Sequence, residues 1–166
     1  MKKLIISAIV ILGFSAASFA QVSASASTSA TIITPIAISK SIDMNFGSVA
    51  VSPTVPGTVV LPTSGSRTQT GGVTLPVTTG TVAAAKFTVT GLAASTYSIT
   101  LPGTITLTSG SNSMTVSNFT STPTPTGILT GGTQDILVGA TLNVAAAQAA
   151  GSYTNATGLV VTVNYN

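Results

Sequence analysis

The stretch from residue 159 to residue 166 sets the strongest constraint on how this chain can fold. It reads Leu-Val-Val-Thr-Val-Asn-Tyr-Asn, and every second position from the start is apolar: Leu159, Val161, Val163 and Tyr165. A period of two with β-branched and aromatic residues is typical of a β-strand with one buried face. An apolar strand in this last position either closes a sheet or lies beside a gap that another strand must fill.

Short runs of the same kind recur along the whole chain, separated by Gly and Pro. The residues are 44% hydrophobic, which is too apolar for a disordered chain despite the many Ser and Thr residues. One helix-prone run, residues 145–150, is too short to form a stable helix alone. The sequence therefore predicts an all-β fold, an antiparallel β-sandwich. We expect strands at 32–38, 42–47, 57–62, 73–77, 85–91, 97–102, 105–107, 114–119, 136–144 and 159–166, and a proline-containing loop at 120–127.

The first 20 residues have the three regions of a secretory signal peptide. Lys2 and Lys3 precede an apolar run from Leu4 to Phe14, and small residues flank Phe19 before Gln21. The apolar run is shorter than the roughly 20 residues that a membrane-spanning helix needs. We therefore expect cleavage after Ala20, no stable membrane insertion afterwards, and a secreted protein that reaches the cell surface or the medium through the periplasm.

Charge is scarce in the remaining 146 of the 166 residues. Lys40, Arg67 and Lys86 face Asp43 and Asp135, which leaves a net charge of +1. Three scattered cations form no basic patch for a phosphate backbone, so nucleic acid is not an expected partner. Charged side chains also keep the edges of sheets from pairing with other chains. A nearly uncharged sheet protein is suited to edge pairing.

The residue inventory argues against an enzyme. The chain contains no His and no Cys, and its two carboxylates lie far apart in sequence. General acid–base and nucleophilic catalysis need a titratable group tuned near neutral pH. A Ca²⁺ site needs several closely spaced carboxylates, and disulfides or thiolate metal sites need Cys. We predict a non-enzymatic protein with no cofactor and no metal.

Residues 21–31 form an uncharged segment between the signal peptide and the first expected strand. Val22, Ala24, Ala26, Ala30 and Ile32 fall on one side of an extended chain, and Ser residues occupy the other side. Two interpretations are open, because Ser and Ala have low β propensity. The segment is either a flexible linker or an arm that becomes a strand when it docks on a partner. The domain boundaries predicted are 1–20, 21–31 and 32–166.

Several segments, in order, resemble one known family. They are Ala30–Ile38, Asp43–Gly47, Ala85–Gly91, Tyr97–Pro102, Val138–Leu142 and Gly151–Tyr153 leading to Val161–Tyr165. This set resembles the bacterial secreted family of unknown function numbered 4402. That family in turn is similar to the spore coat protein U domains and the archaic chaperone–usher pilins, which share a Gly-x-Tyr turn before a final Val-Thr-Val-x-Tyr strand.

The resemblance implies an incomplete immunoglobulin-like, pilin-like sandwich that is completed by a donor strand. It implies a structural subunit of a surface fibre, pilus or coat, with self-association and a periplasmic chaperone and usher as partners. Main-chain hydrogen bonds would hold the added strand, and alternate side chains would fill pockets. The donor face would be Val22, Ala24, Ala26, Ala30 and Ile32, and the groove-side terminal strand would present Leu159, Val161, Val163 and Tyr165.

Two alternatives stay open at the level of sequence. A chain that inserts its own arm would remain a monomer. A monomeric secreted or periplasmic binding module, for example for carbohydrate, would use exposed aromatic rings. Its candidates are Tyr97, Tyr153 and Tyr165, because the chain has no Trp.

Overall fold

The computed structural model describes residues 21–166, so the predicted signal peptide lies outside the described residues. The chain divides after Ile32 into two units. Residues 21–32 carry no helix or strand, and each of their side chains is exposed. The second unit, residues 33–166, holds all of the described secondary structure.

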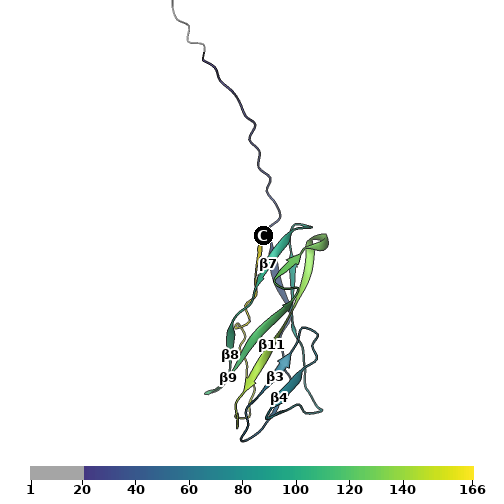
Figure 1. Cartoon of the computed structure of the whole chain (residues 1–166), viewed down its shortest axis with the longest axis vertical. Helices are drawn as coiled ribbons and strands as arrows, with labels where there is room; N and C mark the ends of the chain where they lie inside the picture. Colours follow the sequence, from purple (N-terminus) through teal and green to yellow (C-terminus); the bar gives the residue numbers. More distant parts are fainter. Residues whose placement is uncertain (1–20) are drawn as a thin grey trace, which may run out of the picture. The chain divides into compact units, whose positions relative to one another are not determined.

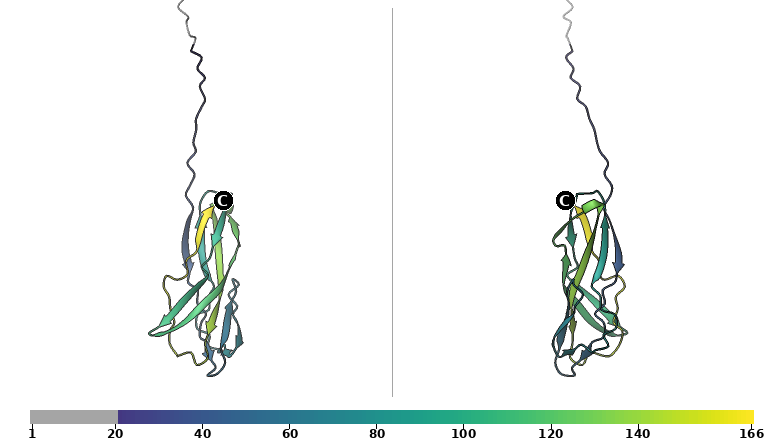
Figure 2. Two further views of the ribbon diagram at one scale, coloured as in Figure 1. Left: turned by 60° about the vertical axis from the view of Figure 1, so that its left-hand side comes forward. Right: turned by 90° about the vertical axis from the view of Figure 1, so that its right-hand side faces the viewer.

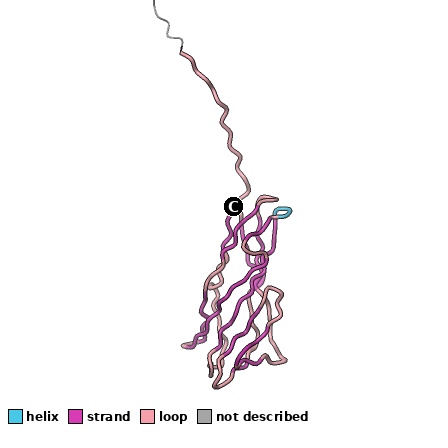
Figure 3. The backbone as a smooth tube through the Cα atoms, viewed as in Figure 1, coloured by secondary structure: helices cyan, strands magenta, loops and turns pink. Residues whose placement is uncertain are grey.

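The second unit is all-β, as predicted, with antiparallel pairing in every ladder and one short 3₁₀ turn, Thr130–Gly132 (Figures 1 and 3). No helix within residues 21–166 has the length and apolar character needed to cross a membrane. The strands are β1 (Ala37–Ile42), β2 (Ala50–Val51), β3 (Gly57–Leu61), β4 (Thr68–Gly71), β5 (Val73–Thr74), β6 (Ala85–Thr90), β7 (Thr96–Thr100), β8 (Thr104–Ser109), β9 (Asn112–Thr122), β10 (Thr126–Ile128), β11 (Thr133–Val144) and β12 (Thr162–Tyr165).

Strand β11 is the centre of the larger, seven-stranded sheet. It pairs with β9 over Leu137–Asn143, with β6 over Thr133–Val138 and with β3 over Ala140–Val144. Because a strand has two edges, β6 and β3 follow one another along the edge that β9 leaves free. Strands β1, β4 and β8 extend the sheet from β6, β3 and β9. The two halves of β11 therefore share β9 on one edge and differ on the other edge, where the first half pairs with β6 and the second with β3.

Gly139 marks the point where the pairing of β11 passes from β6 to β3. The register with β9 shifts between Gly139 and Thr141. A Cβ atom at position 139 would collide with the carbonyl oxygen of Leu61 and lie 2.8 Å from the main chain of Pro62. The end of β3 can approach β11 this closely because glycine has no side chain.

A second, smaller layer completes the sandwich. It is formed by the sheet β10-β7-β12, and the two-stranded ladder β2-β5 is a third, separate sheet. Strand β12, yellow in Figure 2, pairs with β7 from Thr162 to Tyr165, and it is an edge strand of its sheet. The position of β12 agrees with the predicted half-buried strand, because Val161 and Val163 are buried while Thr162 and Asn164 are exposed.

Two apolar clusters fill the space between the layers. The first core contains Ala85, Phe87, Val89, Tyr97, Leu129, Ile136, Val138, Val161 and Val163. The second core contains Phe46, Val59, Leu61, Val73, Val116, Ala140, Leu142 and Val144. Alternate residues of β11 contribute to both cores. Those in the half that pairs with β6 lie in the first core, and those in the half that pairs with β3 lie in the second. Met44 and Phe119 pack against both cores.

Several expected boundaries were wrong. In place of the strand expected at 42–47, the structure has only the end of β1 at Ile42 and a single bridge at Asn45, and β5 ends at Thr74 instead of residue 77. The first strand was expected at 32–38, but β1 begins only at Ala37. Pro35 has no N–H for a ladder, so pairing starts after it. Residues 120–127 were expected to form a loop, yet Thr120–Thr122 complete β9 and Thr126–Gly127 begin β10. Strand structure is interrupted only in the short stretch with Pro123 and Pro125, because the flanking Thr residues fit a pleated strand.

Candidate functional site

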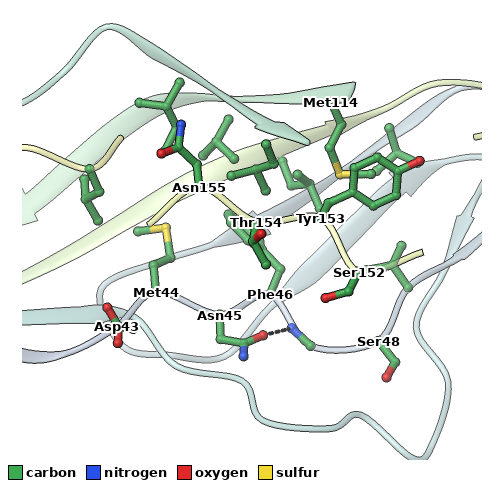
Figure 4. A pocket seen from close by; sticks show the side chains of 18 of the residues that line it. Asp43, Met44, Asn45, Phe46, Ser48, Met114, Ser152, Tyr153, Thr154 and Asn155 are labelled. Atoms are coloured by element: carbon green, nitrogen blue, oxygen red, sulfur yellow. Dashed lines mark hydrogen bonds between the residues drawn. The ribbon is translucent and has the colours of Figure 1, made fainter. Parts of the chain in front are cut away.

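A cleft of about 1,030 Å³ lies in the sandwich unit, residues 33–166. One side is formed by residues 42–51, here called the first wall, and the other by residues 148–156, the second wall. Figure 4 shows labelled residues of the two walls on opposite sides of the cleft, running in opposite directions. The floor between them is apolar, with Phe87, Leu107, Met114, Val116, Leu142 and Val144 among its residues.

The main chain of each wall is hydrogen-bonded on one edge. In the first wall, Asn45 exchanges two hydrogen bonds with Ala83, with N···O distances of 2.8 and 2.9 Å. In the second wall, Thr154 exchanges two with Thr108, at 3.0 and 3.1 Å. Successive residues of an extended chain direct their N–H and C=O groups to opposite edges. The groups of Met44, Tyr153 and Asn155 therefore point to the opposite edge of each wall.

These inner edges have no partner in the part of the chain that the structure describes. The main-chain N–H and C=O groups of Met44, Tyr153 and Asn155 make no hydrogen bond within residues 21–166. Main-chain polar groups are strong hydrogen-bonding groups and are nearly always paired in folded proteins, with protein or with water. The cleft thus combines an apolar floor with two walls that can each accept a strand.

A kink shapes the first wall. Gly47 has φ = +70°, and its N–H donates to the side-chain oxygen of Asn45 at 2.8 Å. From behind, one guanidinium nitrogen of Arg67 donates to the carbonyl oxygens of Phe46 and Ser48, the latter at 2.7 Å. The Nη2 atom of Arg67 is buried without a hydrogen-bond partner in the described residues. Arg67 therefore fastens the kinked wall to the loop before β4.

Beyond the cleft, the seam between β1 and β12 is closed. The Tyr165 hydroxyl accepts a hydrogen bond from the N–H of Leu92 at 2.7 Å and donates to the carbonyl oxygen of Thr34 at 2.9 Å. Ile36 and Ile38 pack against the first core at this end, next to Val161 and Val163. No residue from 33 to 39 or from 160 to 166 lines the cleft.

The structure divides the predicted groove-side residues into two groups. Leu159 lines the cleft. Val161 and Val163 are buried in the first core, each 8% exposed, and Tyr165 closes the end of the seam. The predicted donor-arm residues all belong to residues 21–32, in the first unit, and all are exposed: Val22, Ala24, Ala26, Ala30 and Ile32.

Sequence reasoning missed both walls and Arg67. The first wall comes from the expected strand 42–47, and Gly47 after Phe46 was a signal for its kink. The second wall carries no alternating pattern, so nothing in residues 148–156 marked it. An isolated arginine in so uncharged a chain was a signal for a structural role. Its partners are two main-chain carbonyl groups, which cannot be recognised from the sequence.

The tyrosines offered for a carbohydrate site use their hydroxyls within the protein. Tyr97 is fully buried and donates to Gln134 at 2.8 Å. Tyr153 is half-buried, and its hydroxyl donates to the carbonyl of Ala149 and accepts from Gln148, both at 2.8 Å. Burial raises the pKa of Tyr97 above its ordinary value. Tyr153 is the one of the three that lines the cleft.

Charged groups lie outside the apolar floor. Asp43 pairs with Lys40 at 2.6 Å, and Asp135 pairs with Lys86 at 2.7 Å on the outer side of the large sheet. The hydrogen bond from Lys86, and after it one from Thr88, lowers the pKa of Asp135. Within residues 21–166, no three His, Cys, Asp or Glu side chains lie close enough to hold a metal ion. The cleft is suited to binding an extended apolar segment.

The fold and the cleft define a class, the antiparallel β-sandwich with an open apolar cleft between two walls. A family model described as a domain of unknown function, DUF4402, matches residues 36–165. The match covers most of the chain and all of the strands described in residues 21–166, so the chain belongs to this family. Searches among curated proteins and among solved structures found no match.

Proposed function

We propose that this protein is a non-enzymatic structural subunit of a bacterial surface fibre or coat, assembled by β-strand addition into the cleft. One observation carries the proposal: both walls of an apolar cleft present unpaired main-chain groups, at Met44 on one side and at Tyr153 and Asn155 on the other. An added strand would lie about 4.8 Å from each wall and hydrogen-bond to both.

The donor in this proposal is the segment of residues 21–32 from a second copy. It is uncharged, it has no secondary structure, and its alternate residues from Val22 to Ile32 are apolar. One copy would thus present both a donor arm and an accepting cleft. Such head-to-tail contacts do not close on themselves, so they generate a fibre.

The same proposal places the protein outside the cytoplasm. The predicted signal peptide would direct it to the periplasm and then to the cell surface. The similarity to pilin domains that the sequence suggests supports an immunoglobulin-like, incomplete sandwich and a periplasmic chaperone and usher as helpers. An exposed apolar cleft is an aggregation hazard, so a subunit that waits in the periplasm would benefit from a chaperone strand.

Deletion of residues 21–31 tests the proposal. We expect the mature protein to form multimers in size-exclusion chromatography and the deletion variant to be a monomer. The sandwich should remain folded, because no residue of the two cores lies in the deleted segment. Multimers that survive the deletion would refute the donor-arm mechanism.

A matched pair of point variants separates the inserted face from the opposite face. Ala26→Asp places a charge on the apolar side of the arm, and Ser27→Asp places the same charge on the polar side. We expect the Ala26→Asp variant to lose multimers, because a carboxylate would be buried without a partner. The Ser27→Asp variant should keep them. A mature protein that is monomeric with its arm intact would refute exchange between copies and favour the alternative, a monomeric binding module.

A further inference from the structure

We propose, on the basis of strand addition into the cleft, that the hydrogen bond between Ala147 and Ser52 is a latch, which opens when a strand is added. The N–H of Ala147 donates to the carbonyl oxygen of Ser52 at 2.9 Å. The main chain just beyond the first wall is thus bonded directly to the main chain just before the second wall. Two paired strands lie about 4.8 Å apart, and a strand between them needs about twice that separation. The latch must therefore open before an added strand can pass this end of the cleft.

The cleft is closed by the chain at both ends, and the two closures differ in kind. Beyond Lys40 and Leu159, side chains that pack in or against the first core fill the seam between β1 and β12. At the other end the closure is the main-chain hydrogen bond of Ala147, an exposed residue. Opening a packed core exposes apolar surface, whereas an exposed hydrogen bond can be replaced by bonds to water. The closure at Ala147 is therefore the one that opens more readily.

The two sides of the latch are not held equally. Ser52 is fixed in the loop after β2, because its N–H donates to the carbonyl oxygen of Gly72 at 2.8 Å. Its hydroxyl also accepts the N–H groups of Thr54 and Val55, both at 3.2 Å. Ala147 lies in residues 145–150, which carry no strand or helix, and it makes no other hydrogen bond within residues 21–166. Opening therefore moves Ala147 away from a fixed Ser52.

The backbone of Ala147 is strained in the closed latch. Its φ is +50°, a left-handed conformation that brings the Cβ atom of an L-residue close to the following carbonyl oxygen. The cost of this conformation is similar in size to the net gain from one exposed hydrogen bond. The closed and open states therefore differ little in free energy. An added strand that binds only to the open state can then shift the balance.

A reversible bridge across the latch tests whether it must open. Val51 and Ala147 are exposed and lie on the two sides of the latch, and the chain has no cysteine of its own. The V51C/A147C protein is refolded as a dilute monomer and bridged with a short bifunctional methanethiosulfonate reagent, and mass spectrometry confirms the bridge. We expect the bridged protein to stay monomeric when it is concentrated. After reduction, the same protein should form multimers.

The V60C/T68C protein is the matched control for the bridge. Val60 and Thr68 are exposed partners on β3 and β4, and neither residue lines the cleft. The same reagent therefore joins two neighbouring segments without crossing the latch. We expect this bridged protein to form multimers as readily as its reduced form.

Ala147→Gly tests the strain. Glycine adopts a positive φ without a steric cost, so this variant favours the closed latch. Because only the open fraction accepts the strand, we expect the mature protein to form multimers roughly tenfold more slowly. Ala145→Gly is the matched control, since it removes a methyl group from the same segment at a residue whose φ is not positive. It should not slow the formation of multimers.

The outcomes separate the latch from strand addition. A bridged V51C/A147C protein that forms multimers as its reduced form does would overturn the latch and leave strand addition standing. Loss of multimers from the bridged V60C/T68C protein, or an unchanged rate for Ala147→Gly, would do the same. If the reduced V51C/A147C protein forms no multimers, the comparison of Ala147→Gly with Ala145→Gly decides the question. The absence of multimers from the unaltered protein would overturn strand addition and the latch with it.

Discussion

The two halves of the sandwich are built from the same kinds of residue, yet one, here called the closed end, is covered by a sheet, and the other, here called the open end, borders a cleft. Strand β11 contributes Ile136 and Val138 to the first core and Ala140, Leu142 and Val144 to the second. The sheet β10-β7-β12 covers the first core, and Tyr165 closes its edge. The second core lies partly beneath a cleft whose walls have unpaired inner edges. An apolar strand face is thus left accessible in a cleft where its cover lacks a strand.

The largest expected effect comes from truncating one aliphatic side chain in each core. Ile136 is fully buried, and we expect Ile136→Ala to lower the free energy of unfolding by about 2–5 kcal/mol. Leu142 borders the cleft, where the space left by truncation joins an existing opening, so Leu142→Ala should cost less. Urea unfolding of both variants measures the difference. Equal losses would mean that the open end is packed as tightly as the closed one.

A free peptide of residues 21–33 should stabilise the open end selectively. Added to the chain that lacks residues 21–31, it should raise the free energy of unfolding by about 2.7 kcal/mol at roughly a hundred times its Kd. The same peptide with Ala26→Asp is the control. We expect Leu142→Ala to weaken the response in thermal unfolding more than Ile136→Ala does, because Leu142 lines the cleft and Ile136 does not. A response lost equally in both variants would contradict a site at the open end.

Tyr97→Phe tests the buried polar contact of the closed end. Its hydroxyl donates to Gln134, whose side-chain oxygen also accepts the N–H of Ile128 at 2.8 Å. Loss of this hydrogen bond should cost about 1 kcal/mol near neutral pH. Tyr153→Phe, in the wall of the open end, should cost less, because water reaches its half-buried hydroxyl. Urea unfolding at pH 7 compares the two.

The same residue should give the closed end a dependence on alkaline pH. Because burial raises the pKa of Tyr97, the unfolded chain releases this proton at a lower pH than the folded chain. The free energy of unfolding keeps this contribution below about pH 10 and loses it as the pH rises toward the folded-state pKa. Unfolding measured from pH 8 to pH 11 should fall less steeply for Tyr97→Phe than for the unaltered protein.

The smallest effect is expected on the outer side of β11. Hydrogen bonds from Lys86 and Thr88 lower the pKa of Asp135, so its contribution to stability is present above the unfolded-state value of about 3.9. That contribution disappears as the pH falls through the lower folded-state pKa. We expect the free energy of unfolding to fall slightly less between about pH 5 and pH 2 for Asp135→Asn than for the unaltered protein. Thermal unfolding across this pH range measures the difference. An unchanged slope would show that the exposed pair contributes nothing measurable.

The local alternation of apolar and polar residues predicts most of the strands but few of their boundaries. The alternation in Ala85–Thr90 and in Ile136–Val144 appears directly as alternating burial. Thr120–Thr122 were assigned to a loop because Pro123 and Pro125 dominate the local composition, although pairing with β11 extends to Thr122. The resemblance to the family likewise depended on short sequence segments that follow one another in a fixed order along the chain. The second wall was invisible, since it is held at Thr154 by a single bridge to Thr108, a contact that local composition does not encode.

The sequence by itself determined that this chain forms strands, that they pair in antiparallel sheets, and which face of each strand is apolar. Those properties follow from side-chain spacing, which is local. Only the tertiary structure decided which strands cover which half of β11, where main-chain groups stay unpaired, and which distant main-chain groups the side chains of Arg67 and Tyr165 contact. Every residue except proline offers the same main-chain donor and acceptor, so the choice of pairing partner is settled by packing between distant segments.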